Sequence, residues 1–152
     1  MRITRVAALN LAGHVVLVRI STDAGIEGIG EASPMYPQII CAVVNEVLAP
    51  QIEGENPFEI ERLYDRMLYS RPGRYCNYKL GPQGALTSAI SGVEIALWDI
   101  VGKALGEPVY ALLGGLYRER VQVFASMALA RDRTPDAWAA RARHFVEQGF
   151  GG

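Results

Sequence analysis

The sequence predicts an α+β fold, in which a small antiparallel β-sheet precedes a group of helices. Segments rich in Val, Ile and Thr fill residues 1–33, and helical patterns dominate residues 37–106. A further strand-like segment with its own helix follows residue 118, which indicates that an alternating β/α domain begins there. We therefore expect residues 1–118 to form one domain and residues 119–152 to begin a second.

The predicted sheet contains the strands RITRVAAL, HVVLVRIST and GIEGIGEAS, which begin at residues 2, 14 and 25. The Asp and Gly residues between the last two strands are typical of a hairpin turn. Because each strand follows its predecessor after a short connection, an antiparallel meander is the expected arrangement.

Two helices are predicted directly after the sheet. The segment PQIICAVVNEVLAPQI begins at Pro37, and we expect its helix to end near Ala49, because a proline disfavours helical geometry in the residue before it. The next helix is expected to have Asn56 as its N-cap and Pro57 as its first residue. Its apolar positions are Phe58, Ile60, Leu63, Met67 and Leu68. The Pro and Gly content of residues 71–84 predicts a loop.

The longest predicted helix spans residues 85–106 and should lie at the centre of its domain. Apolar residues recur three and four apart along one face, at Leu86, Ile90, Val93, Leu97, Val101 and Ala104. A second face carries the small residues Ala89, Gly92 and Ala96, which predict the close approach of a neighbouring element. Gly106 is expected to end the helix as its C′ residue, with Pro108 confirming the stop.

The segment after residue 118 has the pattern of one β/α unit. ERVQVFASMALA is expected to form a strand and RDRT a turn. The helix that follows is expected to have Thr134 as its N-cap and Pro135 at its first position.

Charge and composition argue against several classes of protein. The chain of 152 residues is 50% hydrophobic with a formal net charge of -1, and its Lys and Arg residues are scattered, so we expect neither nucleic acid nor a membrane as a partner. We find neither a signal-peptide pattern nor a run of the ~20 apolar residues that span a membrane, and we expect a cytoplasmic protein. Cys41 and Cys76 form no metal-binding or disulfide pattern and are interpreted as reduced thiols.

Three segments, in order, resemble a known family. SGVEIALWDIVGKALGEPVYALLGG, which begins at Ser91, is similar to the N-terminal signature of the enolase superfamily, specifically its mandelate racemase and muconate lactonizing branch. STDAGIEGIGEAS and NPFEIERLYDRM resemble the hairpin and the following helix of that family's capping domain. Glu94 departs from the family pattern, which usually has Asp there, and we expect this change to affect local packing only.

The resemblance implies both a fold and a chemistry. In that family an α+β capping domain covers the mouth of a modified TIM barrel, where barrel active sites lie. Residues 1–118 would then be the enolase N-terminal-like capping domain, a β meander followed by a helical bundle. Residues 119–152 would be the first βα unit of an incomplete barrel. The reaction implied is abstraction of the proton α to a carboxylate, assisted by Mg²⁺ and a Lys or His base.

The resemblance also implies that the catalytic machinery lies outside this chain. The family's Lys-x-Lys base motif follows a GF pair that ends the first barrel helix, and Gly149 and Phe150 match that pair. We therefore assign no catalytic residue and no metal ligand here, expect Mg²⁺ only in the full-length enzyme, and expect this chain alone to be inactive. We expect further barrel residues after Gly152; the alternative is a stub that is disordered or swapped into a partner.

His14 and Tyr36 are the candidate substrate-binding residues. The resemblance places the loops 10–14 and 33–38 over the barrel mouth, where they shape substrate choice. The first loop is short, which suits a polar substrate. The alternative interpretation is a solvated turn histidine and a tyrosine packed on the following helix.

Several other residues are of types that often have a function, but we interpret them as structural. Gly28-x-Gly30 is close to a phosphate-loop pattern, but no helix opens there, so these are expected to be glycines of a turn or of a strand crossing. Glu31 is interpreted as structural, and Asp99 and Lys103 as an i,i+4 pair without chemistry. Trp98 and Trp138 are assigned to a core or interface.

The preferred functional hypothesis is the N-terminal part of a Mg²⁺-dependent sugar-acid dehydratase that acts on a small carboxylate substrate and forms a homo-oligomer. Racemisation or epimerisation, and cycloisomerisation of a muconate, remain open as alternatives within the superfamily. A further alternative is a non-catalytic module that serves oligomerisation or interaction.

Overall fold

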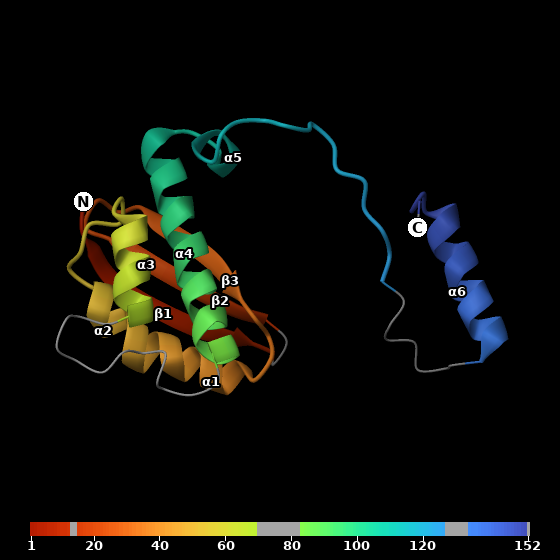
Figure 1. The fold of residues 1–152 in the computed structure, drawn as a ribbon, viewed down its shortest axis with the longest axis horizontal. Coiled ribbons are helices and arrows are strands. Elements are labelled where there is room, and N and C mark those ends of the chain that lie inside the picture. Colours follow the sequence, from red (N-terminus) through yellow and green to blue (C-terminus); the bar gives the residue numbers. More distant parts are fainter. Residues whose placement is uncertain (13–14, 70–82, 127–133, 152) are drawn as a thin grey trace. The chain divides into compact units, whose positions relative to one another are not determined.

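The computed structural model describes residues 1–12, 15–69, 83–126 and 134–151 (Figure 1). The chain divides into two compact units, Met1–Gly115 and Leu116–Gly152, each of which is described by itself. The functional boundary that we expect after residue 118 remains a prediction.

The first unit begins with the predicted antiparallel meander. Strands β1 (Ile3–Leu11), β2 (Val15–Thr22) and β3 (Glu27–Ala32) form a three-stranded sheet in the order β1-β2-β3. Residues alternate between the two faces of the sheet, and its inner face, which includes Val16, Val18 and Ile20, is fully buried. The sheet is therefore confirmed as an antiparallel meander, in its strand order and direction.

The helical segment that follows runs past its expected end near Ala49. It consists of α1 (Pro37–Ala42), the π-helix η1 (Val43–Leu48) and α2 (Ala49–Ile52). The amide of Ala49 donates to the Val44 carbonyl five residues earlier, which is the wide π turn. Pro50 lies in the first turn of α2, directly after this π turn, where the helix changes its bonding pattern.

Helix α3 (Ile60–Tyr69) starts later than the expected start at Asn56 and Pro57. The Asn56 side chain accepts the amide of Phe58 at 3.2 Å, and the Asn56 carbonyl accepts the amide of Glu59 at 3.1 Å. Asn56 thus caps a separate turn before the helix, because a short amide side chain competes with helical bonding at its own backbone. Phe58 lies in that turn and is exposed, whereas the helix buries Ile60, Leu63 and Met67.

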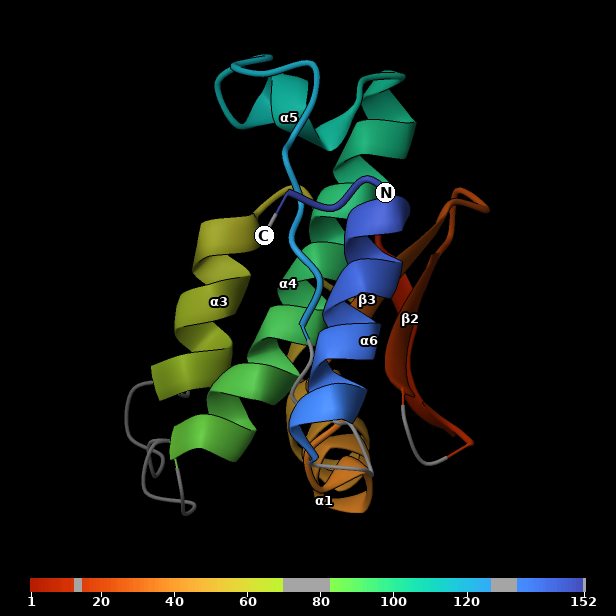
Figure 2. The ribbon, with the colours of Figure 1, turned by 90° about the vertical axis from the view of Figure 1, so that its right-hand side faces the viewer.

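Helix α4 (Gln83–Leu105) is the centre of the first unit, as predicted. It lies between α3 and the sheet (Figure 2) and packs on β3, β2 and α3. Its predicted apolar face is buried from Leu86 to Val101. Gly106 has φ +70°, the left-handed conformation expected of a C′ glycine. Residues 71–82 of the predicted loop lie outside the described residues. Its last two residues, 83 and 84, belong to the helix instead.

Small residues allow α4 to approach the sheet closely. A Cβ atom built on Gly30 would lie 2.0 Å from the carbonyl oxygen of Gly92, and one on Gly28 would lie 2.1 Å from the carbonyl oxygen of Ala96. The small face predicted for the helix therefore meets the glycines of β3. This packing confirms the structural interpretation of Gly28 and Gly30.

The length and hydropathy of α4 differ from what was expected of this chain. The segment Gly84–Leu105 is long and apolar enough to cross a membrane by length and mean hydropathy, contrary to the expectation that no such run exists. Half of its apolar window is buried inside the fold, as in the core helix of a globular protein. The short helix α5 (Val109–Leu112) follows it and was not predicted.

The second unit contains α6 (Pro135–Glu147), which has the predicted start. The Thr134 side chain accepts the amide of Ala137 at 3.4 Å, and Gly149 ends the helix at φ +90°. The amide of Phe150 donates to the carbonyl of Phe145, and their rings meet edge to face at 5.7 Å. The GF pair therefore ends the helix, as expected.

The strand that was predicted to begin at Glu119 is not formed in the part that the structure describes. Residues 121–126 have no strand structure, and the side chain of Phe124 is 77% exposed. A β-strand requires a neighbour to accept its backbone hydrogen bonds, and among the described residues none pairs with this segment. The rest of the predicted strand and the RDRT turn lie outside the described residues, except for Thr134.

Candidate substrate-facing loops

The two loops assigned to substrate recognition leave the same end of the sheet. In the register of the sheet, Leu11 pairs with Val15 and Val16 pairs with Ala32. The β1–β2 turn and the β3–α1 loop therefore begin beside each other. Helix α1 and the first turn of α4 lie at one end of this unit (Figure 1).

Both loops contain a residue in the left-handed backbone conformation. Ala12 has φ +51° and Tyr36 has φ +56°, and they are the non-glycine residues with positive φ in the described part of the chain. This conformation costs about 1–2 kcal/mol in residues other than glycine. Such strain gathers at sites where a loop must hold a particular shape for function.

Tyr36 is held at the start of α1 with its side chain in solvent. Its carbonyl accepts the amides of Ile39 and Ile40 at 2.9 and 3.1 Å, which fixes the backbone. The side chain is 74% exposed, so the alternative of a tyrosine packed on the following helix does not describe it. Met35 and Ile39 are also exposed beside it in sequence. This end of the unit can contact a ligand or another segment of protein.

His14 lies outside the described residues, so its position relative to Tyr36 is a prediction. Ala12, the strained residue of the same loop, was not among the residues predicted from the sequence. Composition offered no signal for it, because alanine carries no preference for the left-handed region.

The other residues that were considered for a functional role make contacts that support the fold. Asp99 and Lys103 form the expected ion pair at 2.6 Å. Trp98 is half-buried against the core and donates from Nε1 to Glu94 Oε1 at 3.4 Å, so the residue that departs from the family pattern bonds within its own helix. Trp138 is half-buried in the second unit.

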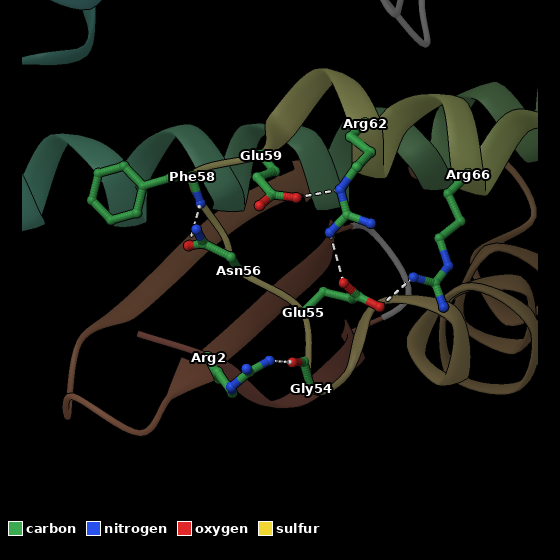
Figure 3. A network of polar contacts seen from close by, with 8 residues as sticks. All are labelled: Arg2, Gly54, Glu55, Asn56, Phe58, Glu59, Arg62 and Arg66. Atoms are coloured by element: carbon green, nitrogen blue, oxygen red, sulfur yellow. Dashed lines mark hydrogen bonds and ion pairs between the residues drawn. The ribbon is translucent and has the colours of Figure 1, made fainter.

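The most perturbed carboxyl group also has a structural role. Hydrogen bonds from Arg62 and then Arg66 hold the pKa of Glu55 down from its ordinary 4.5 to about 2 (Figure 3). These contacts tie the segment before α3 to the helix itself. The i,i+4 spacing of the two arginines was the sequence signal for this site.

No set of metal ligands is present in the described residues. They contain no group of three or more His, Cys, Asp or Glu side chains that could hold a metal ion. Cys41 is a free thiol whose pKa is raised by burial, and Cys76 lies outside the described residues. The described residues therefore offer no group of side chains that fits a bound Mg²⁺.

The architecture, a three-stranded meander covered by α1 to α4, is that of an α+β capping domain. The profile described as "Mandelate racemase / muconate lactonizing enzyme, N-terminal domain" matches residues 6–114. The chain belongs to this family of the enolase superfamily, which confirms the resemblance and the fold class.

Individual relatives agree with this assignment. The chain is 38% identical over 133 residues to a D-xylonate dehydratase of Haloferax volcanii, covering 88% of this chain and 30% of that protein. It is 37% identical over 153 residues to a D-galactonate dehydratase of Pectobacterium atrosepticum, covering 99% of this chain and 37% of that protein. A mandelate racemase/muconate lactonizing protein from Paracoccus denitrificans, solved with magnesium, matches with 36% identity and a TM-score of 0.83, over 96% of this chain and 39% of that one. The chain thus spans about a third of the length of these relatives.

Proposed function

We propose that this chain is the N-terminal part of a Mg²⁺-dependent dehydratase of sugar acids. The observation that carries the proposal is its identity to two relatives that are both named sugar-acid dehydratases, over 88% and 99% of this chain. The family assignment and the magnesium in a related structure support the same chemistry. The substrate is a small carboxylate, and the expected location is the cytoplasm.

The proposed role of this chain is to cover and shape the active site. When bound, Mg²⁺ stabilises the negative charge that develops as the proton α to a carboxylate is removed. The described residues contain no group of side chains that fits the metal. Their contribution is the loop end of the sheet, where Tyr36 is exposed and His14 is expected nearby. These two residues are proposed to contact the substrate.

Two alternative activities belong to the same superfamily, namely racemisation or epimerisation and cycloisomerisation of a muconate. A homo-oligomer is expected in each case. A non-catalytic interaction module is the alternative of another class, and it predicts a folded, self-associating product without Mg²⁺-dependent activity.

The test is an assay of the natural gene product with D-galactonate and D-xylonate, with Mg²⁺ and after its removal by a chelator. We expect formation of the 2-keto-3-deoxy acid, by loss of water from the substrate, that stops when the metal is removed. If the substrate were isomerised without loss of water, the enzyme would be a racemase and the proposed dehydratase activity would be wrong. In the same assay Tyr36→Phe should raise KM more than it lowers kcat, because the hydroxyl is expected to bind substrate rather than transfer its proton.

A further inference from the structure

The outer edge of β1 is occupied by side chains and backbone from the helical side of the domain. Asn45, in η1, accepts the amide of Ala8 at 2.8 Å and donates to the carbonyl of the same residue at 3.3 Å. This double contact has the form that a neighbouring strand would make. Glu53 accepts the amide of Val6 at 3.0 Å. At the start of β1, Ile3 exchanges backbone bonds with Gly54 and Glu55.

The outer edge of β3 is occupied in a similar way by α4. Asp99 accepts the amide of Ile29 at 2.8 Å, and Lys103 donates to the carbonyl of Glu27 at 2.7 Å. Asp99 and Lys103 also contact each other at 2.6 Å, so each holds the other against the strand. The ion pair therefore spans two outward-facing positions of β3.

The contacts of Asp99 and Lys103 with β3 are exposed, whereas those of Asn45 and Glu53 with β1 are partly buried. At the exposed edge of β3 water could satisfy the same backbone groups, so Asp99 and Lys103 are not required there to avoid buried unsatisfied polar atoms. What they exclude is another strand, because an open sheet edge is a template for pairing with a second chain. Charged and polar side chains at the edge are a known means of preventing this.

We propose that Asn45, Glu53, Asp99 and Lys103 close both edges of the sheet against a second copy of this chain. On β1 the contacts come from Asn45 of η1 and from Glu53, which directly follows α2. On β3 they come from Asp99 and Lys103 of α4, which packs beside that strand. Assembly by extension of the sheet is therefore blocked, and the homo-oligomer expected above must use other surfaces. The inference rests on the contacts of these residues and not on the proposed activity.

The test uses two variants. Asn45→Leu frees the backbone groups of Ala8 on β1, and the double variant Asp99→Leu with Lys103→Met frees the Ile29 amide and the Glu27 carbonyl on β3. Glu94→Leu is the matched control, because its carboxylate lies on α4 but bonds within the helix. Sedimentation velocity over a range of concentrations measures association, and amide hydrogen exchange measures the protection of Ala8 and Ile29.

In dilute solution the freed amide should exchange about fivefold faster than in the unmodified chain, since a net hydrogen bond is worth about 1 kcal/mol. As concentration rises, the variants should form larger species than the unmodified chain, and protection of the freed amide should return. The Glu94 variant should change neither quantity.

Folded variants with the association behaviour of the unmodified chain would overturn the proposal, as would association that does not protect the edge amides. If the leucine variants fail to fold, Asp99→Asn and Lys103→Met supply the test separately. In Asp99→Asn the side chain retains an acceptor for the Ile29 amide, so the edge of β3 should stay closed. Association of Asp99→Asn as strong as that of Lys103→Met would also contradict the proposal.

Discussion

Glu55 is the residue whose protonation is expected to destabilise the fold at low pH. Its carboxylate accepts hydrogen bonds from Arg62 and Arg66, which lower its pKa from 4.5 to about 2 (Figure 3). Because the folded state prefers the ionised carboxylate, the associated stability is fully present above about pH 4.5 and is lost as pH falls towards 2. Solvent screening limits the contribution to about 1 kcal/mol.

We therefore expect Glu55→Gln to lower the free energy of unfolding by about 1 kcal/mol at pH 7 and by progressively less between pH 4.5 and 2. Urea unfolding at several pH values measures this difference. Glu61→Gln, a change of an exposed carboxylate in the first turn of α3, is the control. A constant difference between Glu55→Gln and the unmodified chain over this pH range would show that the arginine contacts do not produce the effect.

At the scale of elements, the contact between α4 and β3 depends on glycine. Gly30→Ala would place a Cβ atom 2.0 Å from the Gly92 carbonyl oxygen, and backbone atoms cannot move aside as a flexible side chain can. The helix must shift from the sheet, so we expect a loss of about 3 kcal/mol or more in the free energy of unfolding.

Gly84→Ala is the matched glycine substitution. A Cβ atom there meets no other atom within 4 Å, and the residue lies in the first turn of α4. Alanine should preserve stability or raise it by up to about 1 kcal/mol. Thermal unfolding of both variants measures the contrast, and equal losses would show that the close approach does not control stability.

At the scale of the whole molecule, the chain covers only 30% and 37% of its two dehydratase relatives. We expect the intact mass of the natural product to be roughly twice 16.6 kDa or more, the size of a capping domain with a barrel of ~250 residues. Mass spectrometry of the purified protein measures this directly. A mass of 16.6 kDa would favour the non-catalytic module instead.

Local patterns predicted the regular parts of the fold well, and two helix boundaries poorly. The meander, α4 and the Thr134 cap follow from period, turn residues and capping chemistry that act over a few residues. The end near Ala49 and the start at Asn56 were wrong because a π turn accommodated Pro50 and the Asn56 side chain formed its own turn. For the candidate site, Tyr36 was identified from the resemblance, but its exposure and backbone strain were not.

The sequence by itself determined the order of the elements, the buried face of α4 and the family, because each depends on residue types that are close together in the sequence. Only the tertiary structure decided which backbone groups at the sheet edges meet Asn45 and Asp99, and that the two strained loops share one end. These contacts join residues up to 70 positions apart, and their formation depends on strand register and helix packing. Segment 121–126 shows the same dependence, since β-type residues become a strand only beside a partner.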